Sequence, residues 1–399
     1  MSVALVLGGY VNGYCIIREL AECGVKDIWL FRFGKSSAAR SNRIIGHTMI
    51  ENTAESLREN IVKLRNKFDY IVIYPTDDFQ LELLHAIYDE ISSFCFIPIN
   101  QRNLLSTLSK GHQYEVCDLH GIPCPKSKIL GKENDSSDLS DIVHFTYPLL
   151  IKPIKKYGSE TGVFRSLYIH DKDELARNRD LLTSHMDNGL SFLVSECIPG
   201  DDTNIYSYAA HRSKKGKILN EWIGKKLNQY PNDFGNFSSA TNAAPEVVRE
   251  QGRKLLAHLD VMGFGQPEFK FDARDGQYKL MEVNLRSMMW NRMGALTGVH
   301  LQFTQWCDAM GIEPPIEKQN LTERIHFIYM KHEILNVLTR MGYLKHFLYN
   351  CTQGDRREFA FFDRDDPGPF IQDFLDMPKA LAVNILVIHI LRRSSFRDS

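Results

Sequence analysis

The segment QPEFKFDARDGQYKLMEVNLR, residues 266–286, carries two glutamates, an asparagine and an arginine at spacings that could build a cation site. Its central Ala-Arg-Asp-Gly run predicts a turn between two strands, and the resulting hairpin sets Glu268 opposite Glu282. Because side chains alternate between the two faces of a strand, Asn284 and Arg286 share the face of Glu282. Two carboxylates and an amide oxygen on one face are hard ligands of the kind that Mg²⁺ prefers.

The other face of this hairpin is expected to be apolar, and its predicted members are Phe269, Phe271, Met281, Val283 and Leu285. Like charges directly across a sheet repel each other, and a cation would offset the repulsion between the two glutamates. An exposed hairpin whose polar face only meets water would show the same alternation. The hairpin alone therefore leaves both interpretations open.

Lysines and a glycine-rich turn in another part of the chain could bind phosphate groups. Lys152 ends the apolar segment YPLLIKP and could place a point charge on a phosphate. A polar turn follows, and its backbone N–H groups could cradle phosphate oxygens. The residues concerned are Lys155, Gly158, Ser159, Glu160, Thr161 and Gly162. A tight hairpin turn with exposed lysines is the alternative, and the P-loop pattern G-x-x-x-x-G-K-[ST] is absent.

The segment FLVSECIPGDD joins a strand to a turn and could hold a nucleoside. An adenine could lie against this strand edge and hydrogen-bond to the backbone of Glu196 and Ile198. Asp202 could then accept hydrogen bonds from ribose hydroxyls. An ordinary strand end with a solvated pair of aspartates is the alternative for this segment alone.

The composition is that of a globular protein without a general affinity for polyanions. The chain has 399 residues, which predicts two or three lobes, and its formal charge of −1 gives no general attraction to nucleic acid or anionic membranes. Eight scattered cysteines without a C-x-x-C pair favour free thiols in a reducing cytoplasm. The first residues lack the charged and cleavage regions of a signal peptide, and the apolar stretch 380–391 is too short to span a bilayer. We therefore expect a cytoplasmic protein with no nucleic-acid partner and no transmembrane segment.

The first hundred residues alternate strand-like and helix-like segments, which is the rhythm of a parallel sheet covered by helices on both faces. The predicted strands are residues 3–7, 27–31, 70–74 and 95–97, and the predicted helices are residues 14–23, 55–67 and 80–91. Ligands bind such sheets at the carboxyl ends of the strands. Gly8-Gly9 and the segment from Pro75 to Asp78 both fall at such ends.

A helix over residues 104–120 is predicted to connect this lobe to a region with a different pattern. Short alternating segments there predict an antiparallel or mixed sheet, and they are residues 147–153, 162–169, 191–198, 203–210 and 217–224. A helix over residues 246–259 and the hairpin described above follow them. The fold class is therefore α/β, with α+β lobes after the first. The predicted domains are residues 1–103, 104–315 (with lobes over about 124–195 and 196–315) and 316–399.

The order of these motifs resembles that of the ATP-grasp superfamily over roughly residues 1–310. Lys110 is followed by GIPCP, then by LLIKP, GSETGV, SECIPGDD and the hairpin that ends in EVNLR. Within the superfamily the chain is most similar to the carboxylate–amine ligase branch that contains bacterial D-aspartate ligase. The IPGDD segment, the RDG turn and Trp290 carry that likeness, and a short DRDDPGP segment near the C-terminus adds to it.

The resemblance implies an ATP site. Lys110 and Lys152 match the lysines that bind the ATP phosphates, and residues 158–162 match the loop that closes over the triphosphate. The matches around the nucleoside are the backbone of Glu196 and Ile198 at adenine and the side chain of Asp202 at ribose.

The resemblance also implies a metal site and a catalytic arginine. Glu268, Glu282 and Asn284 match the Mg²⁺ ligands, with Mn²⁺ as an alternative metal. Arg286 matches the arginine near the transferred phosphate and the acyl group, and Lys152 shares the catalytic role through the phosphates. Leu285 replaces the proline that usually follows the asparagine, and this departure removes no ligand.

Candidate contacts with the other substrates are fewer. The N-terminal GGYVNGY lacks the full G-x-G-x-x-G dinucleotide fingerprint, which favours a substrate-side loop. The candidates for substrate contact are Gly9, Thr76, Asp77 and Trp290.

The resemblance therefore implies an ATP-dependent ligase that joins a small-molecule carboxylate to an amine through an acyl phosphate. An amino acid joined to a cell-wall or surface-polysaccharide precursor is the family-level expectation, and homodimers are common in the superfamily. Three alternatives stay open. They are biotin carboxylation, a nucleotide-binding regulatory module that has lost catalysis, and a NAD-dependent oxidoreductase built on the first lobe.

Overall fold

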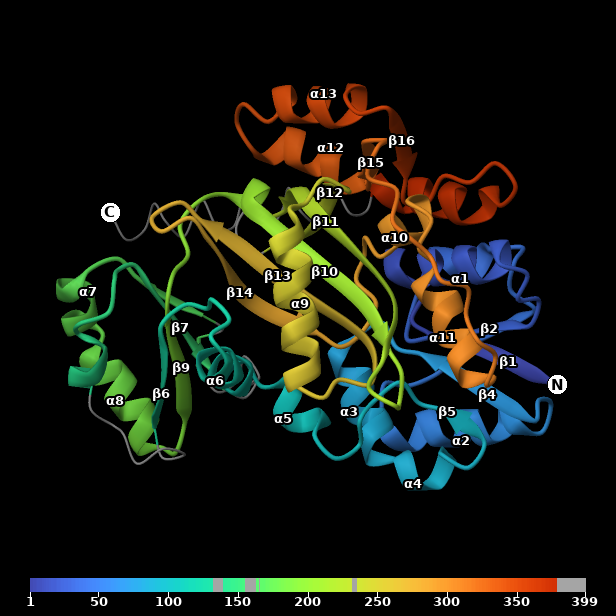
Figure 1. The fold of residues 1–399 in the computed structure, drawn as a ribbon, viewed down its shortest axis with the longest axis horizontal. Helices are drawn as coiled ribbons and strands as arrows, with labels where there is room; N and C mark the ends of the chain where they lie inside the picture. Colours follow the sequence, from blue (N-terminus) through green and yellow to red (C-terminus); the bar gives the residue numbers. More distant parts are fainter. Residues whose placement is uncertain (132–138, 155–162, 165, 232–234, 379–399) are drawn as a thin grey trace.

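The computed structural model describes residues 1–131, 139–154, 163–164, 166–231 and 235–378. Lys155 and the predicted phosphate turn, residues 158–162, lie outside this part of the chain. Figure 1 shows a blue N-terminal lobe, a green small lobe and a large yellow-green sheet between them. The predicted α/β fold class is confirmed.

The N-terminal lobe is built on a parallel five-stranded sheet in the order β3-β2-β1-β4-β5. Its strands are β1 (Ser2–Leu7), β2 (Ile28–Arg32), β3 (Gly46–Met49), β4 (Tyr70–Tyr74) and β5 (Cys95–Phe96), and its helices are α1 (Val11–Glu22), α2 (Ala54–Arg65), α3 (Asp78–Ala86) and α4 (Tyr88–Ile91). The central strands are continuous apolar runs because helices cover both of their faces. Strand β3 was not predicted, since this edge strand is half polar and buries little. The helix predicted over residues 80–91 is interrupted at Ile87.

Two helices, α5 (Leu104–Leu108) and α6 (Lys110–His120), replace the single helix predicted over residues 104–120. Ser109 between them is extended, with φ −76° and ψ 121°. The break makes Lys110 the first residue of α6 and turns α6 toward the large sheet.

The region after α6 contains two sheets instead of the single sheet that the sequence predicted. The small lobe has an antiparallel sheet in the order β6-β9-β7-β8, with its own apolar core. Its elements are β6 (Ser127–Gly131), β7 (Leu149–Pro153), β8 (Leu167–Ile169), α7 (Lys172–Arg177), α8 (Arg179–Asp187) and β9 (Ser191–Glu196). Strand β6 was not predicted.

The large sheet has seven strands in the order β14-β13-β10-β11-β12-β15-β16. They are β10 (Ile205–Arg212), β11 (Ile218–Tyr230), β12 (Asn236–Thr241), β13 (Gly263–Asp272), β14 (Gln277–Asn284), β15 (Ile325–Ile328) and β16 (Arg356–Phe359). Helix α9 (Glu246–His258) packs on one face, whereas α10 (Arg292–Leu296) and α11 (Leu301–Ala309) join the other face to α1. Strands β15 and β16 belong to this sheet although they follow the expected domain boundary at residue 315.

The C-terminal region packs on the large sheet and the N-terminal lobe (Figure 1). It contains α12 (Met330–Thr339), α13 (Leu344–Thr352) and a helical segment over residues 367–378. The DRDDPGP segment joins it to the N-terminal lobe, since Asp363 pairs with Arg18 at 3.3 Å and Asp366 accepts a hydrogen bond from the Tyr14 hydroxyl at 3.1 Å. In the described part of the chain, no helix is both long enough and apolar enough to cross a bilayer.

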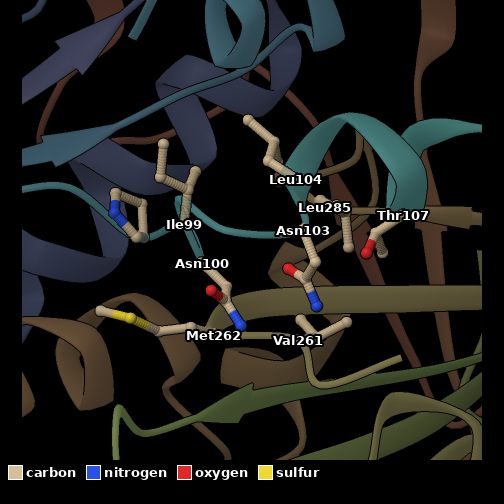
Figure 2. Close-up of a pocket in the computed structure, with 9 residues that line it drawn as sticks. Ile99, Asn100, Asn103, Leu104, Thr107, Val261, Met262 and Leu285 are labelled. Carbon is tan, nitrogen blue, oxygen red and sulfur yellow. The ribbon is translucent and has the colours of Figure 1, made fainter. Parts of the chain in front are cut away.

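A small cavity marks the junction between the N-terminal lobe and the large sheet (Figure 2). The segment from Ile99 to Thr107 forms one side, and Val261, Met262 and Leu285 form the other. Its volume is about 10 Å³, which is room for at most one water molecule. Leu285 is 5% exposed, so the residue that replaces the usual proline packs the two lobes together.

A buried carboxyl group where α1 meets α11 gives a prediction about how stability depends on pH. Glu19 on α1 accepts hydrogen bonds from the backbone N–H groups of Gln302 and Phe303, and burial raises its pKa to about 7. The folded protein holds this proton more tightly than the unfolded chain, so the stabilisation is complete below the ordinary glutamate pKa of about 4.3 and is lost as the pH rises through 7. We expect Glu19→Gln to remove up to about 3 kcal/mol of pH dependence from the free energy of unfolding. Denaturant melts of the wild type and Glu19→Gln at pH 5 and pH 8 measure this. If the free energy of unfolding changed equally with pH in both proteins, the prediction would be contradicted.

Candidate active site

Glu268 on β13 and Glu282 on β14 are direct cross-strand partners, as the hairpin predicted. The apolar face of the hairpin needs a correction. A β-bulge follows Glu268, so Phe269 pairs with Leu280 and Met281 is the extra residue. Leu280 is fully buried and takes the core position that was predicted for Met281, because the prediction assumed an unbroken register. Phe271, also predicted in the core, is only partly buried and lies beside the Tyr278 ring.

Helix α6 is fixed to strand β14 and places its first lysine at the acidic pair. The Gln113 side chain accepts from the Val283 N–H at 3.0 Å and donates to the Val283 carbonyl at 3.3 Å. The Tyr114 hydroxyl donates to the carbonyl of the bulged residue at 3.0 Å. These bonds bring Lys110 Nζ to 2.5 Å from Glu282 Oε2.

A second lysine at the pair was not predicted from the sequence. Lys226 on β11 is 5% exposed, and its Nζ lies 3.5 Å from Glu268 Oε1. The strand predicted over residues 217–224 ended two residues before Lys226. If the alternation had been continued from Trp222, Lys226 would have been placed on the face of the sheet that carries Trp222. Lys152 on β7 lies close enough for its charge to lower the pKa of Glu282. Lysines from α6, β7 and β11 thus surround the two carboxylates.

The two carboxyl groups respond differently to this environment. Lys110 is the main cause that lowers the pKa of Glu282 to about 2, with smaller effects from Lys226 and Lys152. Burial raises the pKa of Glu268, although Lys226 opposes the shift. Glu282 therefore stays ionised at neutral pH, whereas the charge of Glu268 calls for a further cation.

The donor set fits a hard divalent cation. Glu268 Oε1 is buried and, among the described residues, has no hydrogen-bond partner apart from Lys226 at 3.5 Å. Asn284 is 5% exposed and pairs with Gln266 across the hairpin, and its side-chain nitrogen has no partner in the part of the chain that the structure describes. Mg²⁺ binds such oxygen ligands and usually completes its octahedron with substrate phosphates and water. Among the described residues no three histidine, cysteine, aspartate or glutamate side chains cluster.

Arg286 lies where the large sheet meets the N-terminal lobe. Its charge reaches the acidic pair, since it counteracts the effect of burial on the pKa of Glu268. Its guanidinium forms an ion pair with Asp78, with Nε at 3.0 Å from Oδ1. The segment from Pro75 to Asp78, predicted at a ligand-binding strand end, therefore meets the last residue of the hairpin motif.

The predicted adenine edge lies at the end of β9. The Glu196 N–H is bonded to the Lys126 carbonyl at 2.9 Å, and the Glu196 side chain accepts from the Thr146 N–H at 2.7 Å. Within the described residues the Ile198 N–H donates to no backbone carbonyl, and its role at adenine stays a prediction.

Asp202, the expected ribose contact, is closed off in this structure. Its side chain is 0% exposed, and its Oδ2 accepts from the Gln229 N–H at 3.0 Å and from Arg340 at 3.3 Å. Its Oδ1 is buried and has no partner among the described residues. In this conformation a ribose hydroxyl does not reach Asp202, and the neighbouring Asp201 is the exposed carboxylate.

Of the four residues expected to contact a substrate, three are buried and one is exposed. Trp290 is 0% exposed and packs edge-on against Trp222, so it stabilises the core and offers no surface to a substrate, contrary to expectation. Gly9 is buried, and the Thr76 hydroxyl donates to a β1 carbonyl. Asp77 is exposed and caps the first turn of α3.

The small antiparallel sheet and the large sheet thus meet at a pair of carboxylates, and both sheets contribute a lysine to it. No protein-family model matches the chain. A D-aspartate ligase from Enterococcus faecium is 23% identical over 317 residues, which cover 75% of this chain and 74% of that protein. An N5-carboxyaminoimidazole synthetase from Staphylococcus aureus, solved with ADP, superposes with a TM-score of 0.60 at 13% identity, over 81% of this chain and 80% of the other. The biotin carboxylase domain of a Hydrogenobacter thermophilus 2-oxoglutarate carboxylase, solved with MgADP, gives 0.59 at 18% identity, over 78% and 70%.

The chain has the fold of the ATP-grasp ligases, and its sequence is similar to that of a D-aspartate ligase. The predicted resemblance and the predicted enzyme class are confirmed. The roles of the individual site residues stay predictions.

Proposed function

We propose that this ligase activates its carboxylate substrate as an acyl phosphate and then transfers the acyl group to an amine. The observation that carries the proposal is the facing pair Glu268 and Glu282 with Lys110, Lys152 and Lys226 around it. Paired carboxylates are suited to a phosphate-bound cation, and lysines from three elements are suited to a triphosphate.

The first step moves the γ-phosphoryl group of ATP to a carboxylate oxygen. The bond between the γ-phosphorus and the β,γ-bridging oxygen breaks, a bond from the γ-phosphorus to the carboxylate forms, and ADP leaves. Lys110 and Lys226 exchange their present carboxylate partners for phosphate oxygens and hold the triphosphate in line. A Mg²⁺ ion at Glu268, Glu282 and Asn284 would neutralise charge on the phosphates.

The second step joins carbon and nitrogen. The amine attacks the acyl carbon, inorganic phosphate leaves with the electrons of the broken C–O bond, and the amine loses a proton to solvent. The guanidinium of Arg286 stabilises the negative oxygen that develops on the acyl carbon.

The substrates that we propose are an amino acid and a precursor of cell wall or surface polysaccharide. The similarity to D-aspartate ligase supports an amino acid as one substrate.

We also propose a cytoplasmic location, since the eight cysteines are all free thiols, as expected in a reducing compartment. A homodimer stays a prediction from the superfamily.

An ADP-release screen tests this function. Purified protein with Mg-ATP is offered a panel of amino acids paired with sugar acids and peptidyl acids, and a second series adds hydroxylamine. We expect ADP release only with a suitable acid, and an acyl hydroxamate when hydroxylamine replaces the amine. Release of ADP without hydroxamate would exclude the acyl phosphate. Mg-ATP binding without ADP release from any pair would favour the alternative, an inactive nucleotide-binding module.

A further inference from the structure

The proposed catalytic arginine is held by a residue from a different lobe. Arg286 Nε lies 3.0 Å from Asp78 Oδ1, and Nη2 lies 3.4 Å from Asp78 Oδ2. This is a two-point contact that fixes the plane of the guanidinium as well as its position. Asp78 is the first residue of α3 in the N-terminal lobe, whereas Arg286 follows the hairpin of the large sheet.

A second contact joins the same two segments next to the ion pair. The Asn12 side-chain nitrogen donates to the carbonyl of Thr76 at 2.8 Å and to the carbonyl of Ser287 at 3.0 Å. Asn12 is 6% exposed and lies in the first turn of α1. It therefore connects the strand end that leads into Asp78 with the residue directly after Arg286.

The backbone around Asp78 is itself firmly placed. The Thr76 N–H donates to the Gln80 side chain at 2.8 Å, and the Thr76 hydroxyl donates to the Leu7 carbonyl at 2.5 Å. Asp77 caps the helix that begins at Asp78. The carboxylate of Asp78 thus projects from a rigid edge of the N-terminal sheet.

We propose that Asp78 is a positioning residue that holds the Arg286 guanidinium in the orientation needed for the ligase reaction. Its two-point contact occupies the Nε and Nη2 edge of the guanidinium, and Nη1 lies 2.7 Å from the Met288 sulfur, a weak acceptor that a substrate oxygen can replace. The N-terminal lobe thereby supplies part of the catalytic geometry in addition to any substrate contact. The orientation of the guanidinium matters because a displacement of about 1 Å at a catalytic group lowers the rate on the order of 10²-fold.

The test is a double-mutant cycle on the steady-state rate of ADP formation, and it rests on the proposed function. Wild type, Asp78→Asn, Arg286→Met and the double variant are compared. We expect Asp78→Asn to lower kcat by about 10- to 100-fold and to change the KM for ATP by less than about threefold. The double variant should be no slower than Arg286→Met, because Asp78 acts only through the arginine.

Glu82→Gln is the matched control, since Glu82 lies one turn further along α3 and is exposed. It removes the same charge and should keep the wild-type rate. A wild-type kcat in Asp78→Asn, or a loss that adds fully to that of Arg286→Met, would overturn the positioning role while the ligase function stands. An inactive wild type would overturn both.

Discussion

Glu282→Gln is expected to lower the rate of ADP formation by about 10³-fold or more while the protein stays folded. Glu282 remains ionised at neutral pH because Lys110, Lys226 and Lys152 hold its pKa low, so it offers a full negative charge to a cation. Glutamine keeps the shape of the side chain and removes that charge. The partly exposed ion pair to Lys110 contributes little to stability, so the thermal midpoint should change little.

The matched control for this variant is Asp275→Asn at the far end of the same hairpin. Asp275 is 41% exposed and pairs with Lys279, away from the acidic pair. We expect it to keep the wild-type rate. Wild-type ADP formation in Glu282→Gln would show that the cation and the phosphates bind elsewhere.

The second large effect is expected at Lys226, which only the structure brings to the site. Lys226→Met should lower the rate of ADP formation by about 10²-fold and weaken the binding of Mg-ATP. The ammonium group is 3.5 Å from Glu268 and almost fully buried, so its charge acts at low dielectric. Methionine fills similar space without a charge, and it leaves Glu268 to take up a proton, since burial already raises the pKa of that carboxyl.

Lys225→Met separates this effect from a general loss of positive charge. Lys225 precedes Lys226 on β11 and points to the opposite face, where its Nζ lies 5.2 Å from the centroid of the Tyr206 ring. We expect this variant to keep near-normal ADP formation. Equal losses in the two variants would show that Lys226 has no particular role at the phosphates.

The hairpin could be predicted from the sequence because its turn and its alternation are local. Glu268 faces Glu282 as the Ala-Arg-Asp-Gly turn required. The bulge at Met281 could not be predicted, because the partner of its carbonyl is the Tyr114 hydroxyl of another element, and no local pattern indicates that contact. Local alternation therefore gave the facing carboxylates and missed one position of the core.

Contacts between distant segments account for the rest of what was missed. Lys226 lies in the second half of β11, where most residues are polar. The hydrophobic alternation used to predict the strand therefore ended at residue 224, two residues before Lys226. The pairs Asp78 with Arg286 and Asp202 with Arg340 join residues more than a hundred positions apart. Such pairs depend on how the lobes pack, and no local period or turn signal encodes them.

We propose above that Glu268, Glu282 and Asn284 bind the cation that carries the ATP phosphates. A crystal structure with Mn²⁺ and a non-hydrolysable ATP analogue tests it most directly, because the anomalous signal of manganese locates the metal. We predict a peak within about 2.0–2.3 Å of oxygens from Glu268 and Glu282, with Lys110 and Lys226 turned to the phosphates. A metal peak elsewhere, with both glutamates still paired only to lysines, would contradict the account.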